Sequence, residues 1–355
     1  MQAPSGNLDV VTFIIASLVK IVVVLGALLT IVAYTVWLER KLVGRMQNRW
    51  GPSRVGPFGL LQPLADGLKF IFKEDLTPPY VDRPLYLLAP ILSLTTALIS
   101  IAVVPFGNTV TVAGVTTPLQ ITDTQVGLLI ILGVTSIGVY GIALAGWSSN
   151  SKYSLLGSLR ASAQMVSYEV ALGLSLIGVL ILTGTFSLSG IVRAQQGTWF
   201  GFIPKWNIFH LFPLQLIAFF TYLTAAFAET NRVPFDLPEA ETELVAGYHT
   251  EYSSMKFAMF FMAEYANMVT VACVASLLFL GGWTGPVFGP ALLRALLPVI
   301  WFLLRVFVFL FLYIWIRGTL PRFRYDQLMA FSWKVLLPLA MANIIVTSLV
   351  VALTS

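Results

Sequence analysis

Acidic side chains are concentrated in the segment 229–243, which follows directly on a long apolar run. Its carboxylates belong to Glu229, Asp236, Glu239, Glu241 and Glu243. Carboxylates this close repel one another, and apolar surroundings raise their affinity for protons, so some of them can exchange protons near neutral pH. Apolar residues such as Val233 and Phe235 are interleaved with them, which favours a docked segment over a solvated acidic loop. We interpret the segment as a candidate proton relay, since its alternating acids match no oxygen-rich metal loop.

Three more charged residues, Glu169, Glu264 and Arg305, lie inside apolar runs. Each costs roughly 2.5–3.5 kcal/mol in the middle of a membrane helix, so each must be paired, neutralised or hydrated. One interpretation is a static ion pair between an acid and an arginine that locks helices together. The other is a path for protons or ions, which is the usual role of ionisable groups that face the interior of a helix bundle.

The stretch Gly59–Lys73 has the spacing of an amphipathic helix. Its apolar face carries Leu61, Leu64, Leu68, Ile71 and Phe72, and its polar face carries Gln62, Asp66, Lys69 and Lys73. A helix of this kind lies in the membrane interface. It either closes a loop as a plain surface helix or borders a cavity that opens to the bilayer, with Asp66 and Lys69 at the polar rim. In the second case an apolar ligand would enter beside it.

The composition requires a membrane to surround these elements. Of 355 residues, 57% are apolar and only 10% are charged, whereas soluble domains carry roughly 25% charged residues. Eight runs reach the roughly 20 residues needed to cross a bilayer: 10–38, 85–104, 125–147, 162–183, 209–229, 257–281, 295–316 and 333–353. The sequence therefore predicts an all-α integral membrane protein with eight transmembrane helices. The amphipathic helix belongs to the first cytoplasmic loop, and residues 1–355 form a single polytopic membrane domain.

The positions of the basic residues predict the orientation of these spans. Most lysines and arginines fall in the loops that follow the first, third, fifth and seventh spans, whereas the opposite loops contain only Arg193, Lys205 and Arg294. Lysine and arginine are favoured in short cytoplasmic loops, so both chain ends are predicted outside. Most acids share the cytoplasmic side, where partner proteins would dock.

Several kinds of chemistry are excluded by the residues that the chain lacks. A single cysteine, Cys273, cannot form an internal disulfide, a zinc cluster or a cysteine-bound iron–sulfur centre. His210 and His249 are predicted on opposite sides of the membrane, which argues against a hydrolase triad. No phosphate-binding loop is present, and basic residues interleaved with acids at a membrane surface do not indicate nucleic-acid binding. A stand-alone secondary ion transporter is a less favoured alternative, since it would show repeated halves and none is evident, and a purely structural anchor leaves the buried charges unexplained.

Four blocks of sequence carry a resemblance to a known family. They are Trp37–Lys41 with Gly51–Gly56 and Gly59–Lys69; Ala145–Tyr153 with Arg160–Gln164 and Ser167–Glu169; Ala228–Tyr248 with Glu251 and Phe257–Asn267; and Arg317–Met329. In these blocks the chain resembles the membrane-embedded H-type subunit, also called subunit 1, of bacterial respiratory complex I, the proton-pumping NADH:quinone oxidoreductase. Membrane subunits of energy-converting hydrogenases share a looser version of the blocks, so a complex of that type is the alternative.

The resemblance implies a fold of eight transmembrane helices and one amphipathic helix in the bacterial inner membrane. It implies a chamber that a long-tailed quinone, ubiquinone or menaquinone, enters from the lipid. No metal or nucleotide would be bound by this chain, and no complete redox site would lie in it. The implied partners are hydrophilic-arm subunits with iron–sulfur clusters and flavin, small membrane subunits, antiporter-like subunits and lipids.

The same resemblance assigns roles to individual residues. Arg40, Asp66, Lys69 and Phe235 would line the quinone chamber. The remaining assignments concern proton coupling and belong to Glu229, Glu239, Glu241, Glu243, Glu169, Glu264 and Arg305. In this scheme the first four acids form a charged funnel, and the last three residues begin a buried chain of ionisable groups. The third span contains no acid that could extend that chain.

Overall fold

The computed structural model describes residues 10–112, 115–199, 201, 203–236 and 246–354, and helices dominate them. Seven of the described helices are long and apolar enough to cross a membrane. They are α1 (Val10–Met46), α3 (Arg83–Ser100, continued by η2, Ile101–Val103), α4 (Gly127–Ser148), α5 (Lys152–Thr183), α9 (Ser254–Phe279), α10 (Ala291–Thr319) and the continuous run of α11 (Tyr325–Phe331), the π-helical turn η5 (Ser332–Leu336) and α12 (Leu337–Thr354). The structure thus confirms an all-α membrane architecture.

Shorter elements connect the long helices. They are η1 (Pro57–Gly59), α2 (Gln62–Phe72), α6 (Leu188–Ala194), η3 (Asn207–Phe209), α7 (Leu214–Glu229) and η4 (Gly247–His249). Two short antiparallel pairs also form in loops that the sequence analysis did not assign to strands. In one, β1 (Thr109–Val112) pairs with β2 (Val115–Pro118), and in the other, β3 (Thr198–Trp199) pairs with β4 (Ile203–Pro204).

Helix ends differ from the expected spans because hydropathy detects only the part of a helix that lies in lipid. The first helix continues to Met46, eight residues past the expected end, and α5 begins at Lys152, ten residues before the expected start. By contrast, α7 begins only at Leu214, because Pro213 precedes it and proline is poorly accommodated inside a helix. Its 16 residues make it the one shorter apolar helix among those described.

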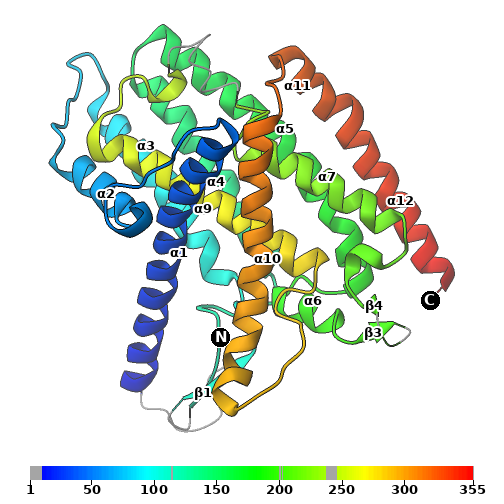
Figure 1. The fold of residues 1–355 in the computed structure, drawn as a ribbon. Helices are drawn as coiled ribbons and strands as arrows, with labels where there is room; N and C mark the ends of the chain where they lie inside the picture. Colours follow the sequence, from blue (N-terminus) through cyan, green and yellow to red (C-terminus); the bar gives the residue numbers. More distant parts are fainter. Residues whose placement is uncertain (1–9, 113–114, 200, 202, 237–245, 355) are drawn as a thin grey trace.

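Charged loops gather at one end of the bundle. The loop after α1 meets the segment before α9, where Tyr80 Oη lies 2.8 Å from Glu251 Oε2, and the amide of Asp82 donates to the carbonyl of Ser148 over 3.0 Å. We call this the charged end. At the opposite end, the amide of Leu128 bonds the carbonyl of Phe186. Figure 1 shows the described start of α1 and the end of α12 away from the charged loops.

The helix α9 is the centre of the packing. It contacts α1, α3, α7 and α10, and most residues of its most apolar stretch are buried. In Figure 1 it crosses behind α1 and α10. The outer helix α1, by contrast, exposes apolar side chains such as Val22 and Val23 along its length, as expected for a surface that faces lipid or a partner.

Close approach of α3 and α4 depends on glycine. A Cβ atom on Gly141 would overlap the hydroxyl of Ser93 and lie 3.0 Å from the carbonyl oxygen of Ala89, whereas one on Gly133 of the same helix would meet nothing within 4 Å. Small residues of this kind let membrane helices pack closely.

We expect Gly141→Ala to destabilise the protein and Gly133→Ala to leave it unchanged or more stable. Overpacking costs about 1–3 kcal/mol, while alanine in place of glycine in an unhindered helix gains up to about 1 kcal/mol. Thermal unfolding of the purified protein in mild detergent measures both variants. Equal unfolding temperatures for the two would show that the contact between α3 and α4 does not require glycine.

Candidate functional site

A buried arginine organises the charged end. Arg232 follows α7 by three residues, and its side chain is only 6% exposed. Its Nε lies 2.7 Å from Oε1 of Glu264 on α9, and its Nη1 lies 3.5 Å from Oε2 of Glu39 on α1. The guanidinium also stacks 4.1 Å from the ring centroid of Tyr265. Two carboxylates and one aromatic face thus compensate a charge that could not otherwise remain in this place.

The carboxylate of Glu39 extends this network to a third helix. The hydroxyl of Tyr265 donates to Glu39 Oε2 over 2.7 Å, and Arg317 of α10 forms an ion pair with Glu39 Oε1. The network therefore contains two arginines and two carboxylates. Balanced pairing of this kind is what buried charges require.

The chain after α7 is fastened by the chain after α10. Arg322 Nη2 lies 3.0 Å from Oδ2 of Asp236, and the amide of Phe323 donates to the carbonyl of Pro234 over 3.2 Å. Burial raises the pKa of Asp236, and the charge of Arg322 opposes that shift. Phe235 packs on Phe323, with ring centroids 5.5 Å apart. The described part of the acidic segment is therefore docked, as its interleaved apolar residues predict.

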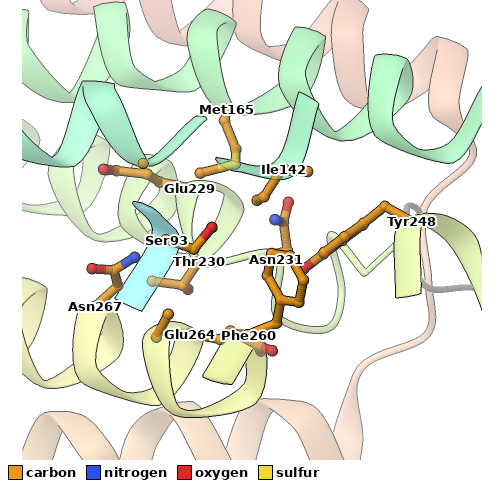
Figure 2. Close-up of a pocket in the computed structure, with 12 residues that line it drawn as sticks. Ser93, Ile142, Met165, Glu229, Thr230, Asn231, Tyr248, Phe260, Glu264 and Asn267 are labelled. Atoms are coloured by element: carbon orange, nitrogen blue, oxygen red, sulfur yellow. The ribbon is translucent and has the colours of Figure 1, made fainter. Parts of the chain in front are cut away.

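A small polar cavity lies beside the ion network. It has a volume of about 30 Å³, and side chains of α3, α4, α5, α9 and the end of α7 line it (Figure 2). Among the residues that the structure describes, Glu229 Oε2, Ser93 Oγ and Asn267 Oδ1 are buried at this cavity without a hydrogen-bond partner. A cavity with this volume and these polar atoms suits water. Because Glu229 and Glu264 both line it, water can connect the two carboxyl groups.

Glu169 extends this set of acids. It lies on α5, where the hydroxyl of Ser136 on α4 hydrogen-bonds its carboxylate. The carboxylates of Glu169 and Glu229 are close enough to interact electrostatically. The structure therefore brings together three of the expected coupling acids, Glu169, Glu229 and Glu264. Ser136 connects this set to the acid-free third span.

Arg305 lies apart from these acids. Its guanidinium donates to the backbone carbonyls of Gly282 and Thr284 and lies 4.9 Å from the ring centroid of Trp206. It is twelve residues, or about 18 Å along α10, from Arg317 of the network. The buried acid Glu264 thus forms an ion pair with Arg232 rather than with Arg305. Arg305 instead contacts the loop that contains Gly282 and Thr284, at the opposite end.

The expected quinone-chamber residues separate into two places. Arg40 Nη1 lies 2.7 Å from Asp66 Oδ2, which joins α1 to α2, and Lys69 is exposed one turn further along α2. Phe235 is instead buried, 4% exposed, between Tyr168 and Phe323. The structure does not bring it to the other three, because its ring fills the core. Glu239, Glu241 and Glu243 lie outside the described residues.

The two histidines lie among aromatic rings. His249 is buried among the rings of Tyr248, Phe257 and Phe260, and burial lowers its pKa to about 3, so it is neutral at physiological pH. His210 packs on Trp199 at the opposite end, as expected. Within the described ranges, no group of three His, Cys, Asp or Glu residues could hold a metal ion.

Sequence reasoning missed the partners that complete the ion network. Glu39, Arg232 and Arg317 fall just outside the apolar runs, so they read as ordinary loop charges. The length of the first helix is the information that would have revealed Glu39. Because α1 continues to Met46, Glu39 lies inside a helix and faces the bundle.

Fold and site together define a polytopic membrane protein with ionisable groups buried between its helices. The chain matches the family model described as NADH dehydrogenase over residues 19–348, and it belongs to this family. It is 73% identical to the NADH-quinone oxidoreductase H-type subunit, numbered 2, of Koribacter versatilis, over 97% of this chain and 99% of that protein. It is 53% identical to the H-type subunit, numbered 1, of Geobacter sulfurreducens, over 97% of each chain, and 53% identical to the H-type subunit of Thermomicrobium roseum, over 92% and 94%.

We expect Arg232→Met to destabilise the protein strongly. Removing one member of a buried ion network costs about 3–5 kcal/mol, because Glu39 and Glu264 remain charged and buried. Arg324→Met is the matched control, since the pair of Arg324 with Asp326 is exposed and such pairs contribute little. Thermal unfolding in mild detergent compares the two. A similar loss in both variants would contradict a special contribution of the buried network.

Proposed function

We propose that the chain is the membrane subunit of an NADH–quinone oxidoreductase that links quinone reduction to proton translocation. The observation that carries the proposal is the polar cavity lined by Glu229 and Glu264, with Glu264 also paired to Arg232 and with Glu169 bound by Ser136 on α4. The relatives bear the name of this complex, in agreement with the site. Other subunits would contain the iron–sulfur clusters and the flavin, and hydrophilic-arm, small membrane and antiporter-like subunits would be the neighbours.

In this mechanism the chain moves charge and the partner subunits move electrons. A proton passes between Glu229 and Glu264 through water in the cavity, and Glu169 receives it deeper in the membrane. Arg232 holds Glu264 and Glu39 in place while charge changes on the neighbouring acids. The segment 229–236 is tied to the chain after α10 by Asp236 and Arg322. A movement of this segment would displace Arg232, which belongs to it, and so disturb the ion network. Glu239, Glu241 and Glu243 follow in the sequence and are assigned to the same relay by the resemblance.

Quinone enters from the lipid beside α2. The pair of Arg40 and Asp66, with Lys69 near it, borders the polar side of this entrance. The apolar residues of α2 point away from the protein core, since Leu64, Leu68 and Phe72 are all exposed. In a bilayer these side chains lie in the interface. The substrate is ubiquinone or menaquinone.

The membrane domain spans residues 1–355, and α7 is its eighth transmembrane helix. At 1.5 Å per residue, the 16 residues of α7 are about 24 Å long, short of the roughly 30 Å hydrocarbon core. It can cross because α5 and α9 shield it and its end lies at the buried ion network. The charged end faces the cytoplasm of a bacterium, and both chain ends lie on the periplasmic side of the inner membrane.

We expect Glu229→Gln to lower coupled quinone reduction by at least about tenfold while the complex still assembles, because the amide cannot accept and release the proton. Quinone reduction and proton movement are measured in inverted membrane vesicles, and copurification of the iron–sulfur subunits confirms assembly. Asp326→Asn is the control, since Asp326 is an exposed acid at the same end. Unchanged rates for Glu229→Gln would rule out the relay.

We also expect Ala65→Trp to slow long-tailed quinones more than short-tailed ones. Ala65 is half-buried in α2 between Asp66 and the exposed Leu64, so a large ring there narrows the entrance. The ratio of kcat/KM for the two quinones measures the effect. Equal slowing of both would argue against entry beside this helix.

A further inference from the structure

The helix α2 is held to the protein by contacts at its middle and at its end. None of its residues is buried, so side-chain packing contributes little to its position. Midway along α2, Asp66 accepts a bond from Arg40 of α1, over 2.7 Å, and one from Gln62 of α2 itself, over 3.0 Å. Near its other end, its contacts are made with α9. The orientation of α2 therefore depends on a few polar contacts.

Two serines at the start of α9 hold the end of α2. The hydroxyl of Ser254 lies 2.9 Å from the carbonyl oxygen of Phe70 and 3.0 Å from that of Lys73. The last carbonyls of a helix lack partners within the helix, so this hydroxyl acts as a cap supplied by another helix. The hydroxyl of Ser253 lies 3.0 Å from the amide and 3.2 Å from the carbonyl of Leu76, which fixes the chain that follows.

Lys256, two residues past Ser254 in the first turn of α9, makes the strongest contact with this chain. Its Nζ lies 3.0 Å from Oδ1 of Asp75 and 2.8 Å from Oγ1 of Thr77. It also lies 4.7 Å from the ring centroid of Tyr86 on α3, and the lysine side chain is only 8% exposed. A buried ammonium with a carboxylate, a hydroxyl and an aromatic face as neighbours is strongly held. It joins α9, α3 and the chain after α2 at one point.

We propose that Lys256 is a positioning residue that fixes α2 at the quinone entrance and so determines how well long-tailed quinones enter. This inference rests on the proposed function. Lys256 precedes Glu264 by eight residues, or about 12 Å along α9, so it does not contact the acid cluster. The isoprenoid tail passes along the exposed apolar side of α2, and a longer tail makes more contacts there. Loosening α2 therefore raises KM for long-tailed quinones and leaves kcat largely unchanged.

The test compares Lys256→Met with Lys256→Arg in the assembled complex. For Lys256→Met we expect KM to rise about three- to tenfold with a long-tailed quinone, with little change in kcat and little change in KM for a short-tailed analogue. Lys256→Arg retains the charge and should recover most of the loss. Lys152→Met is the matched control, because Lys152 is an exposed lysine at the same end. Equal increases in KM for both quinones would overturn the proposal.

Amide hydrogen exchange gives a second measurement that needs no quinone. Exchange in residues 62–72 should become faster in Lys256→Met and stay unchanged in Lys256→Arg and Lys152→Met, while exchange in α5 stays constant. Unchanged exchange in α2 would show that Lys256 does not fix this helix, even if the proposed function holds. Conversely, if Glu229→Gln has no effect on turnover, the proposed function fails. The exchange measurement still tests whether Lys256 fixes α2. Should Lys256→Met prevent assembly, Ser254→Ala removes only the cap and must show the same changes at smaller size.

Discussion

The burial of Arg232 is the constraint on which the charged end depends. A guanidinium at 6% exposure is tolerated only when its charge is balanced, since removing an ion from water costs several kcal/mol. The balance comes from Glu39 on α1 and Glu264 on α9, and Glu39 in turn holds Arg317 on α10. Three long helices and the chain after α7 must therefore meet at one point. Their apolar surfaces alone would let them slide or rotate, whereas this network fixes their register.

Glu264 connects the network to the polar cavity. One side of the residue pairs with Arg232, and the residue also lines the cavity shared with Glu229. Any change in charge at the cavity therefore changes the electrostatic interaction with Arg232 and, through Arg232, with Glu39. Arg232 is also four residues before Asp236, whose contact with Arg322 ties the acidic segment to the end of α10. In the proposed function, this arrangement lets an event at the acidic segment alter charges inside the membrane.

Much of the architecture could be predicted from the sequence, because a helix that crosses lipid needs a continuous run of apolar residues. The long helices lie where apolar runs of about 20 residues predict them, and the resemblance of the sequence blocks agrees with the family match. Glu229, Glu264 and Glu169 could be found because a charge in an apolar run stands out. Their partners could not, since Glu39, Arg232 and Arg317 are far apart in sequence and meet only through tertiary packing. The position of Phe235 in the core likewise depends on Tyr168 and Phe323, which no local pattern reveals.

The two most deeply placed arginines show why partner chemistry matters more than depth. Arg305 is satisfied by the backbone carbonyls of Gly282 and Thr284, which cannot gain or lose protons at physiological pH, so its surroundings keep one charge state. Arg232 is satisfied instead by the carboxylates of Glu39 and Glu264. Hydropathy singles out Arg305, which lies inside an apolar run, but not Arg232, which falls just outside one. In the proposed function, charge movement therefore involves the acids near Arg232, whereas Arg305 is held by backbone carbonyls whose charge does not change.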